Sequence, residues 1–397
     1  MHRPARVVLS LPPAFGGDRA MRAVQPTAIV WQRDGQVSVE RPRETCQAVD
    51  LIAALEEELR RAGRGARAIG FFAYEFAVTL DPLLALPPGR SLLPDAWWAV
   101  LTPAALVGGT PVQRGEWRAE VGAMRLSLDD VAFCRGVEAI RAAIAAGEVY
   151  QVNLTRRVSL PFRGDAAGLF ADLLQSRSSP HACYVADREQ GWAVLSLSPE
   201  LLLRRRGAFV ETRPIKGTVA LSADSRQRSA ARRRLATSAK DAAELAMIVD
   251  VERNDLHRVC WPASVRVQTP RRSMTTISVI HQYATISGRL QDGQGWHSLL
   301  AAMLPGGSVT GAPKRAACSF IARLEPVPRA VYCGAIGVLH QHRGVLALPI
   351  RTGYVTAGML HMHAGCGIVW DSNAVAEEAE SRAKLARWFE VLHGGEA

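Results

Sequence analysis

Many short strand-like segments, separated by few helices, place the strongest limit on how this chain folds. In these segments Val, Ile, Leu and aromatic residues cluster or alternate with polar residues, as is typical of strands. They lie at residues 66–77, 183–187, 192–198, 201–215, 263–269, 283–290, 333–340, 344–355 and 359–369. Strands that follow one another without crossover helices pair as antiparallel neighbours. The sequence therefore predicts large antiparallel sheets rather than repeated βαβ units.

The composition along the chain predicts two parts. The 397 residues, of which 48% are hydrophobic, are enough to bury a large core. A polar stretch broken by Gly and Pro at residues 108–120 indicates a boundary. We therefore expect an N-terminal subdomain at 1–115, which contributes to the sheets, and a second domain at 116–397.

The charge and the cysteines exclude several classes of protein. No apolar run reaches the ~18 residues that a membrane span needs, and the apolar start is too short for a signal peptide, so we expect a cytoplasmic protein with no membrane partner. The seven cysteines include no C-x-x-C pair, which argues against a disulfide framework or a zinc site. The net charge of +11 fits nucleic acid or a small acidic substrate. The densest basic run, at 225–241, lacks interleaved aromatic residues, so we expect a solvated helix face and no nucleic acid partner.

Lysine is almost absent from this chain. Only four of the 48 basic residues are lysines: Lys216, Lys240, Lys314 and Lys384. Because arginine is used wherever either residue serves, a remaining lysine is a candidate for a role that needs a compact ammonium or an amine that loses its proton. Lys216 stands out, since "TRPIKGT" places it where a tight turn would favour a small residue. A lysine in a surface ion pair is the simpler alternative.

Two predicted helices each present a pair of carboxylates on one face. Asp241 and Glu244 are three residues apart, as are Glu377 and Glu380, and Ser238 is placed to cap the first helix. Two such faces brought together would form an oxygen cage suited to Mg²⁺. From spacing alone, two exposed helices with ordinary salt bridges are the simpler explanation.

Two glycine-containing segments, residues 305–314 and 363–372, place small residues between polar groups. Backbone amides beside glycine can approach an anion closely, and the hydroxyl of Thr310 adds a donor. Neither segment has the spacing of a phosphate-binding P-loop, and a tight turn explains each equally well. Arg351 lies within an apolar run that predicts a strand, where it is either an ion-paired core residue or a fork that grips a carboxylate.

Together these motifs resemble the chorismate-utilising enzymes, and within them the large subunits (component I) of aminodeoxychorismate synthases. The matching blocks, in the family's order, are "GEVYQVNLTRR", "SLSPELLL", "ETRPIKGT", "DAAELAMIVDVERNDLHRV", "VIHQYATISGRL", "LPGGSVTGAPK", "EPVPRAVYCGAIGVL", "IRTGYV" and "AGCGIVWDS" with "EEAESRAK". They run from Gly147 to Lys384, well over half of the chain. The resemblance implies an α/β fold of the α+β type, with two large antiparallel sheets packed face to face, helices outside and the site between the sheets.

The resemblance also explains the lysine in "TRPIKGT". This position is lysine in aminodeoxychorismate synthases and typically alanine in anthranilate synthases. An amine that attacks C2 of chorismate can expel the C4 hydroxyl, and ammonia then enters at C4 and releases the lysine. Lys216 is therefore expected to be a covalent nucleophile, which must be uncharged to act. The implied product is 4-amino-4-deoxychorismate, a precursor of 4-aminobenzoate in folate biosynthesis.

Other roles follow from the resemblance residue by residue. Glu200 is expected to be the general acid that protonates the departing hydroxyl, and His281 lies beside the leaving group or is an ordinary core histidine. The implied magnesium site has Glu244 and Glu380 as ligands, with Asp241 and Glu377 as closer or water-mediated partners. The residues expected to bind the two substrate carboxylates and the ring are Gly217, Thr218, Thr310, Gly311, Tyr332, Arg351, Gly365, Gly367 and Lys384.

The resemblance also implies partners and alternatives. Cys366 lacks the flanking pattern of a glutaminase nucleophile, so we expect a separate glutamine amidotransferase to supply ammonia, and we expect no fused lyase. His257 and Trp370 replace smaller family residues and are expected to cause local repacking. An anthranilate synthase large subunit is disfavoured by Lys216. An isochorismate or salicylate synthase is disfavoured by Gln151, where those enzymes have a lysine base. A polyanion-binding protein without enzyme activity is the remaining alternative.

Overall fold

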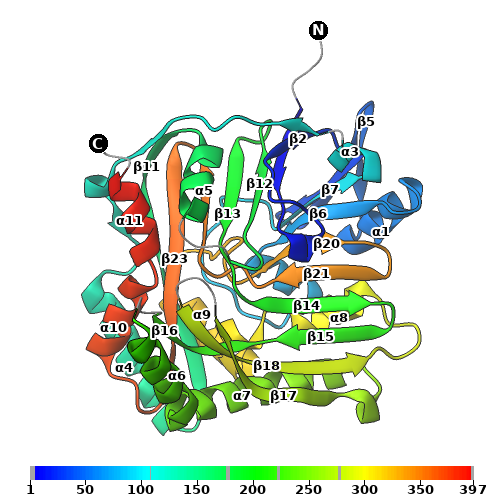
Figure 1. Cartoon of the computed structure of the whole chain (residues 1–397). Coiled ribbons are helices and arrows are strands. Elements are labelled where there is room, and N and C mark those ends of the chain that lie inside the picture. The colour runs from blue at the N-terminus through cyan, green and yellow to red at the C-terminus, as the bar shows by residue number, and fades with distance from the viewer. Residues whose placement is uncertain (1–4, 108, 176–178, 221–223, 276–278, 395–397) are drawn as a thin grey trace.

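The strands form two antiparallel sheets that pack against each other (Figure 1). The computed structural model of the chain describes residues 5–107, 109–175, 179–220, 224–275 and 279–394. Strands of the first sheet run nearly vertically in Figure 1, whereas those of the second run nearly horizontally. The prediction of large antiparallel sheets is therefore confirmed.

The first sheet has 11 strands within the described ranges. Their order is β10 (Arg125–Leu126), β11 (Gln151–Gly164), β23 (Met359–Ile368), β22 (Thr352–Thr356), β13 (Trp192–Ser196), β12 (Cys183–Asp187), β1 (Val7–Ser10), β2 (Arg22–Val24) and β8 (Thr110–Pro111), while β9 (Trp117–Ala119) and β19 (Gly311–Ala312) also pair with β11. The longest pairing joins β11 to β23, strands that lie about two hundred residues apart in sequence.

The second sheet has 12 strands in the described part of the chain. Their order is β16 (Ile215–Ala220), β18 (Val279–Arg289), β15 (Phe209–Arg213), β14 (Leu201–Arg206), β21 (Arg343–Ala347), β20 (Ala335–Leu339), β6 (Arg67–Phe72), β7 (Ala96–Leu101), β3 (Ala28–Arg33), β4 (Gln36–Arg41) and β5 (Glu44–Ala48), while β17 (Arg266–Thr275) pairs with β18.

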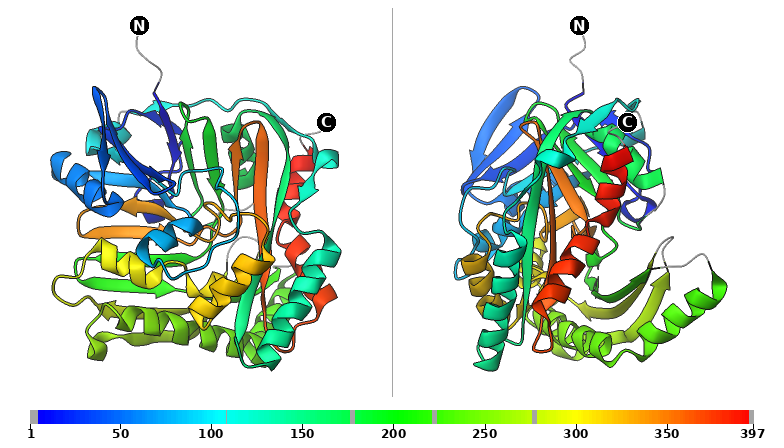
Figure 2. Two further views of the ribbon diagram at one scale, coloured as in Figure 1. Left: turned by 180° about the vertical axis from the view of Figure 1, so that it is seen from behind. Right: turned by 90° about the vertical axis from the view of Figure 1, so that its left-hand side faces the viewer.

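Helices cover the outer faces of both sheets (Figure 2). They are α1 (Leu51–Arg61), α2 (Ala77–Leu80), α3 (Pro103–Val107), α4 (Asp130–Ala145), α5 (Ala166–Gln175), α6 (Ser225–Thr237), α7 (Ala239–His257), α8 (Trp296–Met303), α9 (Lys314–Leu324), α10 (Ala374–Ala383) and α11 (Ala386–Gly394), with short 3₁₀ turns η1 (Pro13–Phe15), η2 (Tyr74–Phe76), η3 (Val121–Ala123), η4 (Pro262–Ser264) and η5 (Gly307–Val309). Helix α7 packs on β16, β17 and β18, whereas α10 packs on α4 and β23. The two helices predicted to carry carboxylate pairs therefore belong to different sheets.

The core between the sheets is built from alternate residues of both. Val185 and Val194 of the first sheet meet Ile69, Phe71 and Val338 of the second in one buried cluster. Because side chains alternate across a strand, the intervening residues face outward and pack under the helices. Two further buried clusters complete the core, one on first-sheet strands with α5 and α11, and one that joins second-sheet strands and helices to β11 and β23.

Both predicted parts of the chain contribute to each sheet. Strands β1, β2 and β8, which precede residue 115, belong to the first sheet, and β3 to β7 belong to the second. Strand β6 pairs with β20, and β1 pairs with β12. The N-terminal region thus shares its sheets with the rest of the chain, and the division at residue 115 stays a prediction.

A fully buried guanidinium ties four segments together near one end of the sandwich. Arg329 donates two hydrogen bonds to Glu325 (2.8 and 2.6 Å), one to the carbonyl of Val309 (2.8 Å) and one to the carbonyl of Asn153 (2.8 Å). Glu325 also accepts a hydrogen bond from the amide of Thr155 (2.8 Å). Arg329 therefore fixes the turn η5 against strand β11.

The core between the sheets predicts a large loss of stability for Phe71→Ala. Phe71 is 0% exposed and meets the Trp192 ring edge-on at 5.5 Å. Its truncation should lower the free energy of unfolding by about 3–5 kcal/mol, as measured by urea denaturation. Phe209→Ala on the same sheet, where the side chain is 43% exposed, is the matched control and should cost less than about 1 kcal/mol. Equal losses in the two variants would contradict this assignment of the core.

Candidate active site

A glycine bulge aims the side chain of Lys216 into the site. Lys216 pairs with Gln282 and Thr218 pairs with His281, so Gly217 is an extra residue in β16. Gly217 has a left-handed backbone (φ 76°), and an added Cβ there would lie 2.9 Å from an Asp241 oxygen. Only glycine combines this conformation with the close approach of a carboxylate. The segment is therefore a bulged strand and not the expected tight turn, and the bulge explains why glycine follows Lys216.

The amine of Lys216 lies among protein groups rather than in bulk water. Its Nζ donates to the carbonyl oxygen of Ser308 at 3.4 Å. It also lies 3.3 Å from the position that a Cβ would take at Gly367. Burial lowers the pKa of Lys216, while the charges of Glu244, Glu200 and Glu380 oppose that shift and the charge of Lys384 adds to it. The amine is therefore easier to deprotonate than an exposed lysine.

Ser308 connects Glu200 to Lys216. Its hydroxyl donates to Glu200 Oε1 at 2.7 Å, and its carbonyl accepts the hydrogen bond from Lys216. Glu200 is buried, and burial raises the pKa of its carboxyl to about 7, although the Ser308 hydrogen bond and the Lys216 charge oppose the rise. A carboxyl with such a pKa is partly protonated at neutral pH, as a general acid must be.

His281 is buried on β18, opposite Thr218 of β16. Burial, and then the charge of Arg351, lowers the pKa of His281 to about 3. The ring is therefore uncharged at neutral pH. A neutral imidazole can accept or donate one hydrogen bond but cannot supply a positive charge.

The structure brings the two carboxylate pairs toward Lys216 from opposite helices. Asp241 lies on α7 against Gly217, and Glu244 is the acid whose charge most affects Lys216. On α10, ligand atoms of Glu377, Glu380 and Cys366 all lie within 4.8 Å of one another.

Both carboxylates of the predicted pair on α10 have polar partners in the protein. Glu377 is buried and accepts a hydrogen bond from the Ser372 hydroxyl (2.7 Å). Glu380 forms an ion pair with Lys384 (2.8 Å), whose amine also donates to the carbonyl of Gly365 (2.8 Å). Lys384 therefore balances part of the negative charge that the four acids concentrate here.

Several residues predicted to bind the substrate carboxylates lie in other backbone settings than the sequence suggested. Arg351 lies between β21 and β22 with a left-handed backbone (φ 52°), so its placement within a strand was wrong. Gly365 and Gly367 lie within β23, which confirms the strand predicted at 359–369, so the alternative of a tight turn at 363–372 is wrong for these two glycines. They are needed because a Cβ would lie 2.1 Å from the Leu154 carbonyl or 2.8 Å from the Gln151 side chain.

Other predicted residues are already engaged within the protein. The Thr310 hydroxyl donates to the carbonyl of Gly306 at 2.8 Å, so its proton is not directed to an anion. The Tyr332 ring stacks on His363 with a centroid distance of 5.1 Å. Gly311 lies in β19 opposite Val152. The side chain of Thr218 lies outside the described part of the structure.

Sequence analysis missed two buried residues at this site, Ser308 and Glu252, and named Gln151 only as the position of a lysine base in other family members. Ser308 contacts both Lys216 and Glu200. Gln151 is 0% exposed, and neither its amide oxygen nor its nitrogen has a hydrogen-bond partner among the described residues. Glu252 accepts a hydrogen bond from Thr212 (2.7 Å), and its pKa is raised well above the usual value by burial and by the nearby charge of Glu200. Buried polar residues in matched sequence blocks were the available signal.

The two residues noted as departures from the family lie at the margin. His257 ends α7, and the Trp370 side chain is 57% exposed. Arg141 Nε donates to the Trp370 carbonyl at 3.3 Å, which joins this segment to α4.

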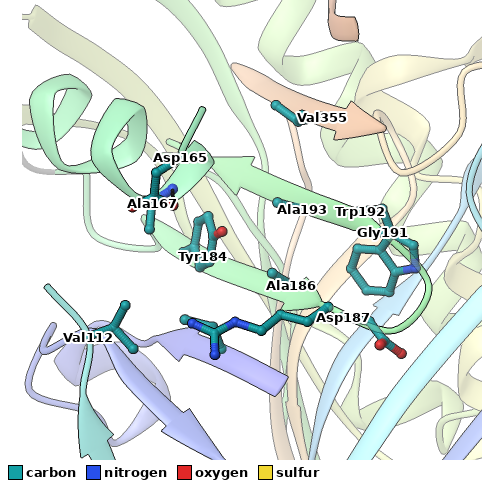
Figure 3. A pocket seen from close by; sticks show the side chains of 12 residues that line it. Val112, Asp165, Ala167, Tyr184, Ala186, Asp187, Gly191, Trp192, Ala193 and Val355 are labelled. Atoms are coloured by element: carbon teal, nitrogen blue, oxygen red, sulfur yellow. Dashed lines mark hydrogen bonds between the residues drawn. The ribbon is translucent and has the colours of Figure 1, made fainter. Parts of the chain in front are cut away.

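A separate cavity of about 190 Å³ lies on the outer face of the first sheet (Figure 3). Val8, Tyr184, Ala186, Ala193 and Val355 form much of its lining. None of the residues that line it was predicted to act on substrate, so it is not a part of the candidate site.

Comparison with known proteins identifies the family. A family model described as chorismate binding enzyme matches residues 15–390. The chain belongs to this family. The family match therefore favours an enzyme over the alternative interpretation, which was a polyanion-binding protein without enzyme activity. Within the described residues, no helix is both long and apolar enough to span a bilayer.

Relatives within the chorismate binding enzyme family carry more than one activity. The chain is 40% identical over 255 residues to aminodeoxychorismate synthase component 1 of Klebsiella aerogenes, which covers 64% of this chain and 55% of that protein. It is 36% identical over 295 residues to anthranilate synthase component 1 of Streptomyces coelicolor, which covers 74% of this chain and 56% of that protein. The chain thus spans about half the length of these curated relatives.

Solved structures of the family share the fold. Anthranilate synthase component I of Streptococcus pneumoniae superposes with a TM-score of 0.78 at 23% identity, covering 97% of this chain and 92% of that one. The menaquinone-specific isochorismate synthase of Escherichia coli superposes with a TM-score of 0.73 at 23% identity, covering 99% and 96%. The expected fold of two packed antiparallel sheets with outer helices is therefore confirmed.

The buried Glu200 predicts a pH-dependent stability difference between the wild type and Glu200→Gln. Below the ordinary carboxyl pKa of 4.5 the group is protonated whether the chain is folded or not. As the pH rises through about 7, the unfolded chain ionises freely while the buried carboxyl resists, so the wild type loses stability that the Gln variant keeps. The variant should gain on the order of 3 kcal/mol relative to the wild type across this range.

Urea unfolding of both proteins at about pH 5 and about pH 8 measures this gain. Glu148→Gln, which alters an exposed carboxyl, is the control and should show no such change. The same stability difference at both pH values for Glu200→Gln would contradict a raised pKa.

The close contact at Gly367 predicts that Gly367→Ala disturbs the site. The new methyl would press on Gln151 (2.8 Å) and on the Lys216 amine (3.3 Å). We expect chorismate consumption to fall by about 10- to 100-fold with little change in melting temperature, because displaced catalytic groups are costly. Gly122→Ala, where a Cβ meets nothing within 4 Å, should leave the rate unchanged. Wild-type activity in Gly367→Ala would exclude this contact as a constraint.

Proposed function

We propose that this chain is the chorismate-converting component of an aminodeoxychorismate synthase, which replaces the C4 hydroxyl of chorismate with an amino group. One observation carries the proposal: the Lys216 amine, with its lowered pKa, and the Glu200 carboxyl, with its raised pKa, meet at the same residue, Ser308. Opposite shifts of this kind produce a neutral nucleophile and a protonated acid together. Chorismate chemistry at C4 needs both.

The proposed reaction has two displacements. The neutral amine of Lys216 attacks C2, the ring double bond shifts, and the C4–O bond breaks as Glu200 protonates the departing hydroxyl to water. Ammonia then attacks C4, the double bond shifts back, and the bond from C2 to the lysine nitrogen breaks. The nitrogen that enters as ammonia loses one proton, and this proton restores the one that Glu200 gave to the departing hydroxyl. Overall, chorismate and ammonia therefore give 4-amino-4-deoxychorismate and water.

His281 acts in this scheme as an uncharged hydrogen-bonding group. Its lowered pKa keeps it neutral, so it orients the leaving hydroxyl without protonating it. Glu200, whose pKa is about 7, remains the group able to give a proton. The division of roles follows from burial, which disfavours the charged form of each side chain.

The carboxylates on α7 and α10 fit a magnesium ion. Mg²⁺ prefers oxygen ligands, which are offered here by Glu244, Glu380, Asp241 and Glu377. The charges of Glu244 and Glu380 both raise the pKa of Lys216, so acids from both helices lie near its amine. Cys366 lies beside Glu377 and Glu380, but burial raises the pKa of its thiol to about 12, so it stays protonated and does not compete as a ligand. When bound, Mg²⁺ would neutralise the ring carboxylate of chorismate and favour loss of the hydroxyl.

The positive groups around the site would bind the two substrate carboxylates. Lys384 lies next to Glu380 and the carbonyl of Gly365, where it can reach a carboxylate held at the metal. Arg351 is close enough to His281 to influence its pKa, which supports a second binding position beside the ring. The remaining proposed contacts are Gly217, Thr218, Gly311, Tyr332, Gly365 and Gly367, with Thr310, whose hydroxyl would have to exchange its hydrogen bond to Gly306 for one to the substrate.

The proposed reaction consumes ammonia, which we infer comes from a separate glutamine amidotransferase. The name of the Klebsiella relative, component 1, implies that a second component exists for that enzyme. All seven cysteines are unbridged, and Cys366 is buried within β23 with a raised pKa, unlike a glutaminase nucleophile. Free ammonium should replace the partner in the test tube.

Anthranilate synthesis is the competing activity, because the Streptomyces relative matches a larger share of the chain. The product decides between them. The chain should be incubated with chorismate, Mg²⁺ and ammonium, and then with a lyase that converts aminodeoxychorismate. We expect 4-aminobenzoate on chromatography. Anthranilate in its place, from folded protein, would refute the proposal and establish the competing activity.

Lys216 variants test the covalent step. Lys216→Ala and the charge-retaining Lys216→Arg should both lose 4-aminobenzoate formation by at least about 100-fold, because neither supplies a neutral amine. Without ammonia, the wild type should accumulate chorismate minus water on the peptide that contains Lys216, detected by mass spectrometry. An active Lys216→Arg variant would be incompatible with a lysine nucleophile.

A further inference from the structure

A second, larger cavity lies away from the candidate active site and is lined by basic residues. Its volume is about 540 Å³, within the usual range for small-molecule sites. Residues 13–16, which include η1, line one part of it, and residues of β6, β14, β20 and β21 line most of the rest. These four strands are neighbours in the second sheet (Figure 1). The basic residues that line it are Arg67, Arg204, Arg205, Arg206, His340 and Arg343. No acidic residue is among the described residues of its lining.

Strand alternation separates these arginines into two groups. The guanidinium of Arg205 lies over the Trp296 ring of α8 at 5.1 Å, on the outer face of the sheet. Arg204 and Arg206, its neighbours on β14, therefore face the opposite side. Arg67 begins β6 on that same inner side, because it alternates with Ile69 of the core between the sheets. Side chains from separate strands thus converge on the cavity.

The positive charge in this cavity is only partly balanced by acidic groups of the described residues. Arg204 has one ion pair, at 3.3 Å to Glu211, and Glu211 is shared with Arg213 at 2.7 Å. Within the described ranges, Arg67, Arg206 and Arg343 form no ion pair.

Arg67 shows this imbalance most clearly. Its Nε is buried without a hydrogen-bond partner in the structure, and burial alone lowers the pKa of Arg67. The charges of Arg67 and Arg343 also help to lower the pKa of His340, after burial. A buried donor without an acceptor is costly, and a bound anion would remove that cost.

We propose that this cavity binds a small polyanion with two or more phosphate or carboxylate groups, held by the guanidinium groups of Arg67 and Arg204 with Arg206 and Arg343 at the rim. Planar guanidinium forks match the oxygen geometry of both kinds of group. The inference is independent of the proposed reaction, because none of the residues expected to act on chorismate lines the cavity.

Isothermal titration of the full chain tests the site with two probes, inorganic pyrophosphate and citrate, at about 0.15 M salt. We expect one saturable site, and the tighter probe tells whether phosphate or carboxylate groups are preferred. The Arg67→Gln/Arg204→Gln variant should bind the preferred probe at least about tenfold more weakly, because two charge-assisted contacts are lost. No binding of either probe at millimolar concentration would overturn the proposal.

The control removes the same charge elsewhere. Arg118 and Arg163 lie opposite each other where β9 pairs with β11 of the first sheet, so Arg118→Gln/Arg163→Gln should leave affinity unchanged within about twofold. Equal weakening in both double variants would show general charge attraction and refute a built site. Tighter binding of a short single-stranded oligonucleotide than of either probe would also refute it. If Arg67→Gln/Arg204→Gln does not fold, Arg206→Gln/Arg343→Gln, at two exposed positions, should show the same loss.

Discussion

The buried guanidinium of Arg329 sets the geometry on which the candidate site depends. Its four hydrogen bonds join η5 to β11 and to the end of α9. Ser308 lies within η5, next to the Val309 carbonyl that Arg329 binds. A charge this deeply buried persists only with full hydrogen bonding, so the turn has little freedom to move. The positions of Glu200 and Lys216 relative to each other therefore follow from an interaction outside the reacting groups.

Burial then determines which protonation state each group favours. The same loss of solvent lowers the pKa of Lys216 and of His281 and raises the pKa of Glu200. The nearby acids limit the downward pKa shift at Lys216, and the charge of Lys216 limits the upward pKa shift at Glu200. A site of this kind holds a weak base and a weak acid side by side, which separated surface residues in water could not do.

The strands and helices were largely predictable from sequence, because they depend on local patterns. The run at 201–215 is observed as β14 and β15, and Ser238 caps α7 by accepting a hydrogen bond from the Asp241 amide at 3.2 Å. The scarcity of lysine singled out Lys216, and the three-residue spacing singled out the carboxylate pairs on α7 and α10. The structure brings these residues together around Lys216. The roles of those residues stay predictions, as does the magnesium site.

The errors arose where distant segments meet. Ser308 contacts Glu200 across 108 positions of sequence, and no local pattern signals such a contact. Gly365 and Gly367 belong both to the strand predicted at 359–369 and to the possible turn at 363–372, and the sequence alone does not show that close packing of β23 on β11 excludes side chains there. Arg351 was assigned to a strand from its apolar neighbours, although its left-handed backbone interrupts that strand.

Because Gly367 and Lys216 are in contact, substitutions at these two positions depend on each other during evolution. The amine fills the space that a side chain at 367 would need, so a long residue at 216 is tolerated only where 367 is already bare. A descendant that shortened residue 216 would free one side of this space, while the Gln151 side chain, 2.8 Å from the position of a Cβ at 367, would still restrict the other. The two sites are thus epistatic, and the order of substitutions between them has a direction.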